Sequence, residues 1–385
     1  MFLIKFFNPL RRTGTVSLVV KVSSRRNIGF VIPTIYNRMM AEVNTGMTGE
    51  GDTKRQCTRQ RIGTHNGTFH CDEALACFLL RQLPEYKDAE IIRTRNQSTL
   101  DTCDVVVDVG GVFDPSKHRY DHHQRSFSHS MASLQPNKPW TTKLSSAGLV
   151  YLHFGERVLR TIKGLTDADD GKVQAIYDKV YENFFEEIDA VDNGIAQTDE
   201  KPRYLITSTL SSRVKHLNPD WLDQSPDEEG GFQKAMALTG LEFLDKVSYY
   251  SNSWWPAREL VEAALDKRFE VDDSGEVLVL QQGGCPWKEH LFALEESKKI
   301  EKPIRYVLYT DQNGKWRVQC VPIDSSSFTN RLSLPEKWRG VRNEELCELS
   351  GIPGCIFVHA NGFIGGNETY EGAIQMARTS LAQAK

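Results

Sequence analysis

The chain has 385 residues, 39% of them hydrophobic, with 47 Lys and Arg against 51 Asp and Glu and a net charge of −4. This length and composition are those of a globular protein of about two domains, and they exclude a collagen-like, wholly disordered or small disulfide-linked chain. The charge also excludes a generally basic surface as a means of holding nucleic acid, so an anionic partner requires a local site.

Residues 1–40 differ from this average, because they contain seven basic residues and no acidic residue. Basic residues interspersed with short apolar runs are typical of a mitochondrial transit peptide. We therefore expect residues 1–45 to be a matrix-targeting segment, cleaved or disordered; a disordered basic tail and a nuclear address are the alternatives. No later segment approaches the roughly 18 consecutive apolar residues of a membrane span, so we expect no stable membrane association.

The next residues predict the start of an α/β fold. Residues 46–60 are polar and rich in Gly and Thr, as in a flexible linker, and the folded part is expected to begin at Arg61. The apolar pattern predicts a helix over 72–83 and strands over 89–94 and 104–111. The alternation of strands and helix favours a parallel sheet covered by helices.

Helices dominate the middle of the chain, and strands return toward its end. Helices are predicted over 145–159, 172–191 and 232–250, an acidic surface loop over 216–231, and a connecting helix over 257–267. A second domain is predicted with strands over 276–280, 305–309, 316–321 and 355–359, a hairpin turn at 311–314, a glycine-rich turn and a last helix ending at 383. The eight cysteines form no Cys-x-x-Cys pair, so we expect reduced and mostly buried thiols.

Histidine and aspartate recur where the predicted strands and helices end. The series consists of His65, His70, Asp72, Asp108, Asp121, His122, His123, Asp189 and Asp192. Loops that follow parallel strands gather along one edge of a sheet, so these side chains are expected to meet there. Imidazole and carboxylate ligands without cysteine favour Mn²⁺ or Mg²⁺ over structural zinc. The alternative is a set of unrelated structural residues, such as helix caps.

Six segments of this chain resemble the DHH phosphoesterase superfamily, which includes RecJ-type exonucleases, oligoribonucleases and family II inorganic pyrophosphatases, and most closely the melanocyte-proliferating-gene exonuclease family. They are 62–74 (IGTHNGTFHCDEA), 106–111 (VVDVGG), 118–127 (HRYDHHQRSF), 187–195 (EIDAVDNGI), 285–290 (CPWKEH) and 354–366 (GCIFVHANGFIGG). The resemblance implies a two-domain α/β phosphoesterase. Its parallel-sheet catalytic domain would be 61–255, its smaller α/β substrate-binding domain 256–385, and its active site the cleft between them.

The resemblance also implies two divalent cations, with Mn²⁺ expected and Mg²⁺ as the alternative. It assigns His65 and His70 to one cation, Asp72 and His122 to the other, and Asp108 to both. The last aspartate is Asp189 or Asp192, which spacing does not separate. Such a pair of cations can generate hydroxide from a shared water and neutralise phosphate oxygens during in-line displacement. His123 is expected to hydrogen-bond the phosphate or leaving oxygen, and Asp121 to orient a ligand histidine.

One feature departs from the superfamily pattern. The first motif of that superfamily is His, three residues, Asp, one residue, Asp, whereas here His70 follows His65 after four residues and takes the place of a carboxylate. A neutral imidazole leaves the two cations less neutralised by one charge. The preference of the site for a particular metal is therefore open.

Substrate-binding residues are expected around the metal site and in the second domain. Arg119 and Arg125 flank the Asp-His-His triplet and either contact phosphate or form surface salt bridges. Lys143 precedes Ser145 and Ser146, which either present N–H groups to an anion or simply cap a helix. In the second domain the expected residues are Lys288, His290, Arg331, Arg339, His359 and Asn361, with Gly362, Gly365 and Gly366 in a loop near phosphate. Trp287 and Trp338 are core residues or stacking surfaces.

The expected function is a 3′–5′ RNA exonuclease that acts on single-stranded chain ends in the mitochondrial matrix and the nucleus, including the nucleolus. One alternative is a phosphatase or pyrophosphatase for small molecules, or a phosphodiesterase for short oligonucleotides or dinucleotides. Another is a regulatory RNA-binding protein without catalysis. Because residues 41–385 carry a net charge of −11, RNA would be held by a metal-filled cleft and not by a basic surface.

Overall fold

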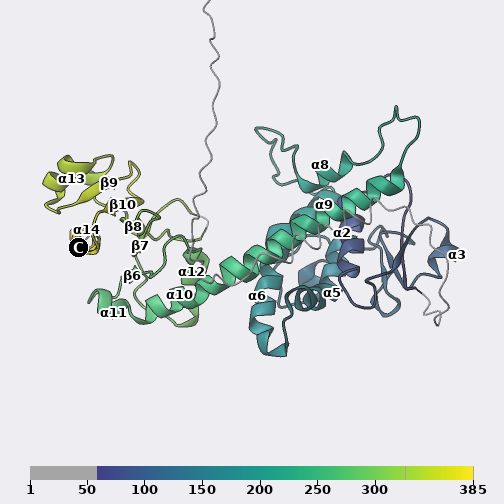
Figure 1. The fold of residues 1–385 in the computed structure, drawn as a ribbon, viewed down its shortest axis with the longest axis horizontal. Coiled ribbons are helices and arrows are strands. Elements are labelled where there is room, and N and C mark those ends of the chain that lie inside the picture. The colour runs from purple at the N-terminus through teal and green to yellow at the C-terminus, as the bar shows by residue number, and fades with distance from the viewer. Residues whose placement is uncertain (1–58, 326, 385) are drawn as a thin grey trace, which may run out of the picture. The chain divides into compact units, whose positions relative to one another are not determined.

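A computed structural model describes residues 59–325 and 327–384 of the chain. The predicted targeting segment 1–45 and most of the predicted linker 46–60 lie outside the described residues. The described part contains two five-stranded sheets and many helices (Figure 1), which confirms a mixed α/β fold.

The first sheet is mainly parallel, as the sequence predicts. Its order is β2 (Glu90–Arg93), β1 (Arg61–Thr64), β3 (Val105–Val107), β5 (Arg119–Tyr120) and β4 (Phe113–Asp114). Only β4 runs antiparallel to its neighbour. All three valines of β3 are buried, as expected of a central parallel strand. The carboxyl ends of the adjacent strands β1, β3 and β5 therefore share one edge of the sheet.

A fully buried helix, α2 (Cys71–Leu80), packs against α5 (Ser146–Lys163) and α9 (Glu228–Tyr249). Burial on all sides explains why its sequence is an almost continuous apolar run and not an amphipathic pattern. A glycine in α9 permits the close approach, because a Cβ atom at Gly240 would overlap the ring of Phe78.

Two long helical segments each contain a π-helical turn between two α-helices. α6 (Asp170–Val180) continues through a π-turn, Tyr181–Phe185, into α7 (Glu186–Asp192). α9 continues through a π-turn, Tyr250–Trp254, into α10 (Trp255–Asp266). The predicted domain boundary at 255–256 falls inside this second segment. The shorter helices of this half are α3 (Gln97–Leu100), α4 (Met131–Leu134) and α8 (Leu210–Lys215).

The second sheet is mixed and separates two apolar cores. Its order is β6 (Val277–Val279), β7 (Tyr306–Thr310), β8 (Trp316–Cys320), β10 (Ile364–Asn367) and β9 (Cys355–Val358), with only β6 and β7 parallel. One core includes α13 (Asn343–Ser350) and α14 (Tyr370–Gln383), and the other includes α10 and α12 (Trp287–Ser297).

The sequence-based expectations are wrong in three places in the second half of the chain. Helices α12 and α13 and the short α11 (Arg268–Val271) were not anticipated. The predicted acidic loop 216–231 is shorter, because α9 begins at Glu228. The predicted glycine loop is also partly wrong: Gly365 and Gly366 belong to β10 and pair with β8 and β9. At Gly365 a Cβ would crowd Met376 and Leu334, so close packing and not a turn requires glycine there.

All described cysteines are free thiols, as expected. Within residues 59–325 and 327–384, no helix is both long enough and apolar enough to cross a membrane.

Candidate metal centre

The three adjacent parallel strands each deliver one side chain to the same edge of the first sheet. His65 directly follows β1, Asp108 directly follows β3, and His122 lies two residues beyond β5. This is the geometry that strand ends in a parallel sheet predict. Helix ends supply the other members: Asp72 and Glu73 lie in the first turn of α2, and Asp192 is the last residue of α7.

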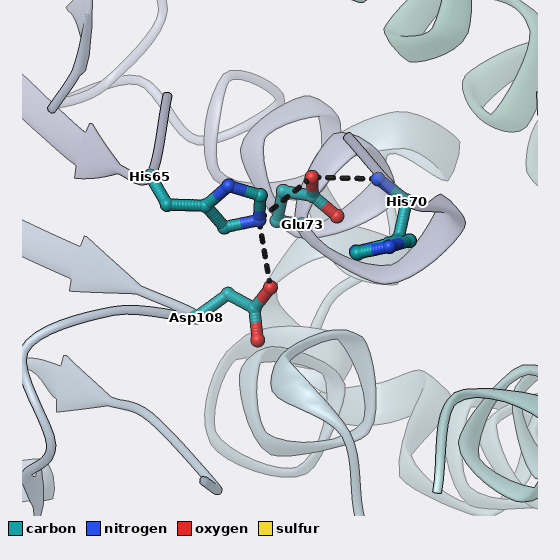
Figure 2. Close-up of side chains that lie close together, drawn as sticks. All are labelled: His65, His70, Glu73 and Asp108. Carbon is teal, nitrogen blue, oxygen red and sulfur yellow. Dashed lines mark hydrogen bonds and ion pairs between the residues drawn. The ribbon is translucent and has the colours of Figure 1, made fainter. Parts of the chain in front are cut away.

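Asp108 joins two histidines at the centre of this group. His65 Nε2 lies 3.3 Å from Asp108 Oδ2 and 3.2 Å from Glu73 Oε1. His122 Nε2 lies 3.1 Å from Asp108 Oδ1 and 3.1 Å from Asp192 Oδ2. Figure 2 shows the ring of His65 directed at the carboxylates of both Asp108 and Glu73.

The backbone of Asp108 adopts an uncommon conformation, with φ of 61°. Such a left-handed conformation is sparsely populated by residues other than glycine and costs on the order of 1–3 kcal/mol. A hydrogen bond of 3.1 Å from Asp108 N to Tyr120 O helps to hold it. The turn into Gly110 and Gly111, which also have positive φ, directs the Asp108 carboxylate toward the two histidines.

The carboxylates of this site lack the usual cationic partners. Asp72, Glu73 and Asp108 are buried, and no Lys or Arg in the described part of the chain forms an ion pair with them or with Asp192. Burial and the charges of Asp72 and Asp108 raise the pKa of Asp192 to about 10. Burial likewise raises the pKa of Glu73 to about 7. Without a metal, protons therefore neutralise part of this charge.

In His65 and Asp108, hydrogen bonds outweigh the effect of burial and favour the charged form of each side chain. Burial disfavours a charge on His65, but its hydrogen bonds with Asp108 and Glu73 raise its pKa to about 10. Burial also disfavours the Asp108 carboxylate, but hydrogen bonds with His122 and His65 lower its pKa to about 2. A divalent cation would compete with the proton of His65 for the same oxygens.

The residues present fit divalent cations. Asp72 Oδ1 and Glu73 Oε2 are buried and have no hydrogen-bond partner among the described residues, which costs about 1–3 kcal/mol for each group. Potential donor atoms within 4.8 Å of one another form three sets: His65, His70, Glu73 and Asp108; Asp108, His122 and His123; His70, Asp72 and Asp192. Asp108 belongs to two of the sets. Nitrogen and oxygen donors without thiolate suit Mn²⁺ or Mg²⁺.

Glu73 is the member that the sequence analysis did not anticipate. Its Oε1 accepts a 2.7 Å hydrogen bond from the backbone N–H of His70, as the third residue of a helix does in a capping box (Figure 2). The same oxygen lies beside His65 Nε2. The spacing from His70 to Glu73 predicts the capping role, but nothing in the spacing indicates the second contact.

The structure also distinguishes the two aspartates that spacing could not separate. Asp192 Oδ2 faces His122, whereas Asp189 is fully buried beneath the start of α5. Asp189 accepts hydrogen bonds from Ser145 N (2.9 Å), Ser145 Oγ (2.7 Å) and the Tyr181 hydroxyl (2.8 Å). Ser145 caps α5, while Ser146 Oγ donates to Asp72 Oδ2 at 2.7 Å. The serine pair thus connects Asp189 and Asp72 to the start of α5.

We expect Gly148→Ala to destabilise this arrangement. A Cβ at Gly148 would overlap the Asp189 carboxylate, which cannot retreat without losing its three hydrogen bonds. Overpacking of this kind costs about 1–3 kcal/mol. Urea unfolding should show the loss. Gly171→Ala, at a glycine of α6 with open space around it, should not lower the free energy of unfolding and should raise it by up to about 1 kcal/mol, because alanine is favoured over glycine in a helix. Equal stability of both variants would contradict this packing.

His123 and Asp121 lie beside the carboxylate cluster. His123 Nδ1 is 2.8 Å from Asp121 Oδ1, and the other Asp121 oxygen accepts a 2.6 Å hydrogen bond from Gly111 N. The hydrogen bond with Asp121 raises the pKa of His123, although burial opposes it. The His123 side chain is 61% exposed. Asp121 therefore orients an accessible imidazole that is more basic than usual.

A pocket of about 640 Å³ opens at this edge of the sheet. Its wall includes His65, Asp108, Asp121 and His123, and also Arg95 on the loop that follows β2. Arg95 is exposed and has no hydrogen bond or ion pair with any described residue. Its guanidinium is thus free for an anionic ligand, although the sequence alone gave no reason to select it.

Other predicted substrate residues of the first half lie elsewhere. Arg119 donates to the carbonyl oxygens of Lys117, His118 and Cys103. Arg125 is exposed but does not line the pocket.

Several residues in 256–385 that were predicted to bind substrate instead form hydrogen bonds within the protein. His290 is buried with Nε2 2.7 Å from Trp254 O, and burial lowers its pKa. Arg331 makes two hydrogen bonds with Glu295. Arg339 donates to Leu334 O, although the residue is exposed.

The remaining predicted residues of the second half divide between surface and core. His359, Asn361 and Lys288 are exposed, whereas Gly362 is buried. Trp287 and Trp338 are buried in apolar cores, which confirms the core alternative for Trp338, while Trp287 also lines a second pocket.

Comparison with known proteins identifies one family. Residues 61–381 match the MYG1 exonuclease family, described as an uncharacterised protein family (UPF0160). The MYG1 exonuclease of Bos taurus is 63% identical over 324 residues, which is 84% of this chain and 85% of that protein. The Homo sapiens MYG1 exonuclease is 61% identical over 84% of this chain and 86% of its own length. A MYG1 protein of Dictyostelium discoideum is 49% identical over 84% and 97%, respectively. No solved structure matches.

Proposed function

Because the chain belongs to the MYG1 exonuclease family, we propose that it is a nuclease and that the candidate metal centre hydrolyses phosphodiester bonds. The observation that carries this proposal is the convergence of four carboxylates and two buried histidines, without a Lys or Arg ion pair in the described part of the chain. Two members of this cluster, His65 and Asp108, line an open pocket. Buried charge of this kind is usually paired or bound to metal.

Two divalent cations would be held on either side of Asp108. His65 and Glu73 would hold one, and His122, Asp72 and Asp192 the other, with exposed His70 near both groups. When bound, such cations lower the pKa of water and neutralise phosphate oxygens. We propose Mn²⁺, with Mg²⁺ as the alternative, because the donors are nitrogen and oxygen only.

The protein's own groups would position the substrate and hold a proton. With Nδ1 engaged by Asp121, the protonated form of His123 carries its second proton at Nε2, where it can donate to a phosphate or leaving oxygen. Gly111 N fixes the Asp121 carboxylate and thereby the imidazole. Arg95 supplies a cation at the same pocket.

We further propose single-stranded RNA as substrate, removal of nucleotides from the 3′ end, and action in the mitochondrial matrix and the nucleus. The resemblance to the melanocyte-proliferating-gene exonuclease family supports the first two points. The charge of −11 over residues 41–385 is unfavourable for tracking along a duplex backbone and favours a short segment held at one site. The basic residues 1–40 support import into mitochondria.

One parallel assay tests this proposal. The full chain is incubated with Mn²⁺, Mg²⁺ or EDTA and with end-labelled single-stranded RNA, DNA, duplex RNA, a dinucleotide and pyrophosphate. We expect stepwise shortening of single-stranded RNA from its 3′ end only with metal. Cleavage of pyrophosphate or dinucleotide alone would identify a small-molecule enzyme, and binding without cleavage of any substrate would indicate a regulatory protein.

Arg95→Ala is expected to raise KM for RNA about tenfold with little change in kcat. A hydrogen bond between an ionised group and phosphate is worth about 1.5–3 kcal/mol, and 1.4 kcal/mol corresponds to tenfold in affinity. Steady-state kinetics on a short labelled RNA measures the effect. The matched control is Lys87→Ala, which removes an exposed charge ahead of β2, at the opposite end of that strand from Arg95. If Arg95→Ala and Lys87→Ala have similar kinetics, Arg95 does not bind the substrate.

A further inference from the structure

A second pocket, of about 390 Å³, is lined by residues from the end of α9, the turn that follows it, the start of α12 and strands β7 and β8. We call it the aromatic pocket, and its defining residues are Tyr249, Trp254, Trp287, Tyr309, Lys288 and Gln319. It shares no residue with the pocket at the metal centre. Its volume lies in the range of about 300–1,000 Å³ that is usual for small-ligand sites.

The inner wall of the aromatic pocket is fixed by polar contacts. Trp254 Nε1 donates to Glu289 Oε2 at 3.0 Å, and Trp254 O lies 2.7 Å from His290 Nε2. The rings of Trp254 and His290 lie 4.4 Å apart. Lys179 forms an ion pair of 3.1 Å with Glu289 and so neutralises the one carboxylate at the pocket. The indole is thereby held in place before any ligand arrives.

Three polar groups at the aromatic pocket remain free. Lys288 is exposed and forms no hydrogen bond or ion pair with a described residue. Gln319 Oε1 accepts a 2.7 Å hydrogen bond from the Tyr309 hydroxyl, which leaves the Gln319 amide nitrogen available as a donor. Tyr249 is 47% exposed, and its hydroxyl is also unpaired within the described chain. The aromatic pocket thus offers aromatic surface, one cation and neutral hydrogen-bonding groups.

We propose that the aromatic pocket binds a single nucleotide, with its base against the aromatic rings and its phosphate at Lys288. Aromatic rings stack on any nucleobase, and a lysine binds phosphate as a point charge. The Gln319 amide can donate to an acceptor on the edge of the base. A peptide is a less suitable ligand, because the aromatic pocket offers aromatic rings and a single cation and not the extended groove of a peptide-binding site. The inference does not require the proposed nuclease activity.

Binding in the presence of EDTA tests the inference separately from hydrolysis. The full chain is titrated with AMP, adenosine and an adenylate dinucleotide, and binding is followed by calorimetry and by tryptophan fluorescence. Saturable binding of AMP identifies a free mononucleotide as the ligand, and binding of the dinucleotide alone identifies the end of a chain. Either result supports the inference if Lys288→Ala or Tyr249→Ala weakens the observed binding.

Two exposed side chains can be changed without disturbing the core. Lys288→Ala should weaken AMP roughly tenfold and leave adenosine unchanged, because only the phosphate contact is lost. Tyr249→Ala should weaken both ligands roughly tenfold. Lys337→Ala and Tyr204→Ala are the matched controls, at exposed residues outside the aromatic pocket. Absence of saturable binding at millimolar concentrations, or binding that neither Lys288→Ala nor Tyr249→Ala changes, would overturn the inference.

Discussion

Asp108→Asn is expected to lower kcat for RNA on the order of a thousandfold or more, while the chain stays folded. Asp108 is the carboxylate in contact with both buried histidines, so its charge would be shared by both cations. A loss of several kcal/mol of charge stabilisation converts to rate at tenfold per 1.36 kcal/mol. Asparagine keeps the shape of the side chain and tolerates a positive φ, so the strained turn is retained.

The same substitution should also reduce the stabilisation that Mn²⁺ gives to the wild-type chain. Thermal unfolding with and without Mn²⁺ measures this effect, since a ligand that binds only the folded state raises Tm. Asp88→Asn removes an exposed carboxylate outside the pocket and should keep both activity and metal response. Undiminished hydrolysis in Asp108→Asn would refute the assignment of the metal centre.

Asp192→Asn and Asp189→Ala should separate catalysis from stability. Asp192 has a pKa raised to about 10, so it is protonated at neutral pH without metal, and asparagine resembles that state. We therefore expect unchanged stability in EDTA but a fall in kcat on the order of a hundredfold, since removal of a preorganised charge-stabilising group costs about 10²–10³. Labelled RNA and urea unfolding measure the two quantities.

Asp189→Ala should show the reverse. It leaves Ser145 N–H and the Tyr181 hydroxyl without their acceptor inside the protein, at about 1–3 kcal/mol for each buried group. The free energy of unfolding should fall by about 2–5 kcal/mol even in EDTA. If Asp189→Ala has full stability but fails to bind Mn²⁺, then Asp189 is the metal ligand and the assignment of the two aspartates is wrong.

The metal centre was predictable where it depends on strand ends. His65, Asp108 and His122 follow adjacent parallel strands, but only β3, before Asp108, is an apolar β-branched run that reveals such a strand in the sequence. The strand before His65 reads RIGT and the strand before His122 only RY, so these two are weaker signals. Asp189 and Asp192 were not separable, because three residues along a helix place both on nearly the same face. The position of Ser145, 44 residues earlier in the chain, decides between them.

The second half was less predictable because its polar residues have partners distant in sequence. Arg331 and Glu295 are 36 residues apart, and His290 and Trp254 are also 36 residues apart. The sequence alone does not distinguish a basic residue that pairs with an internal carboxylate from one that binds phosphate. Gly366 illustrates the same limit for glycine: a Cβ there would crowd Phe357 and Arg317 within the sheet, so it serves packing and not a phosphate loop.

Anomalous diffraction at the manganese absorption edge, on crystals grown with Mn²⁺, tests the central claim most directly. We predict manganese peaks on both sides of the Asp108 carboxylate, one near His65 and the other near His122, and their absence in crystals of Asp108→Asn. Crystals without manganese at Asp108, from protein that still hydrolyses RNA in EDTA, would contradict a metal-dependent site.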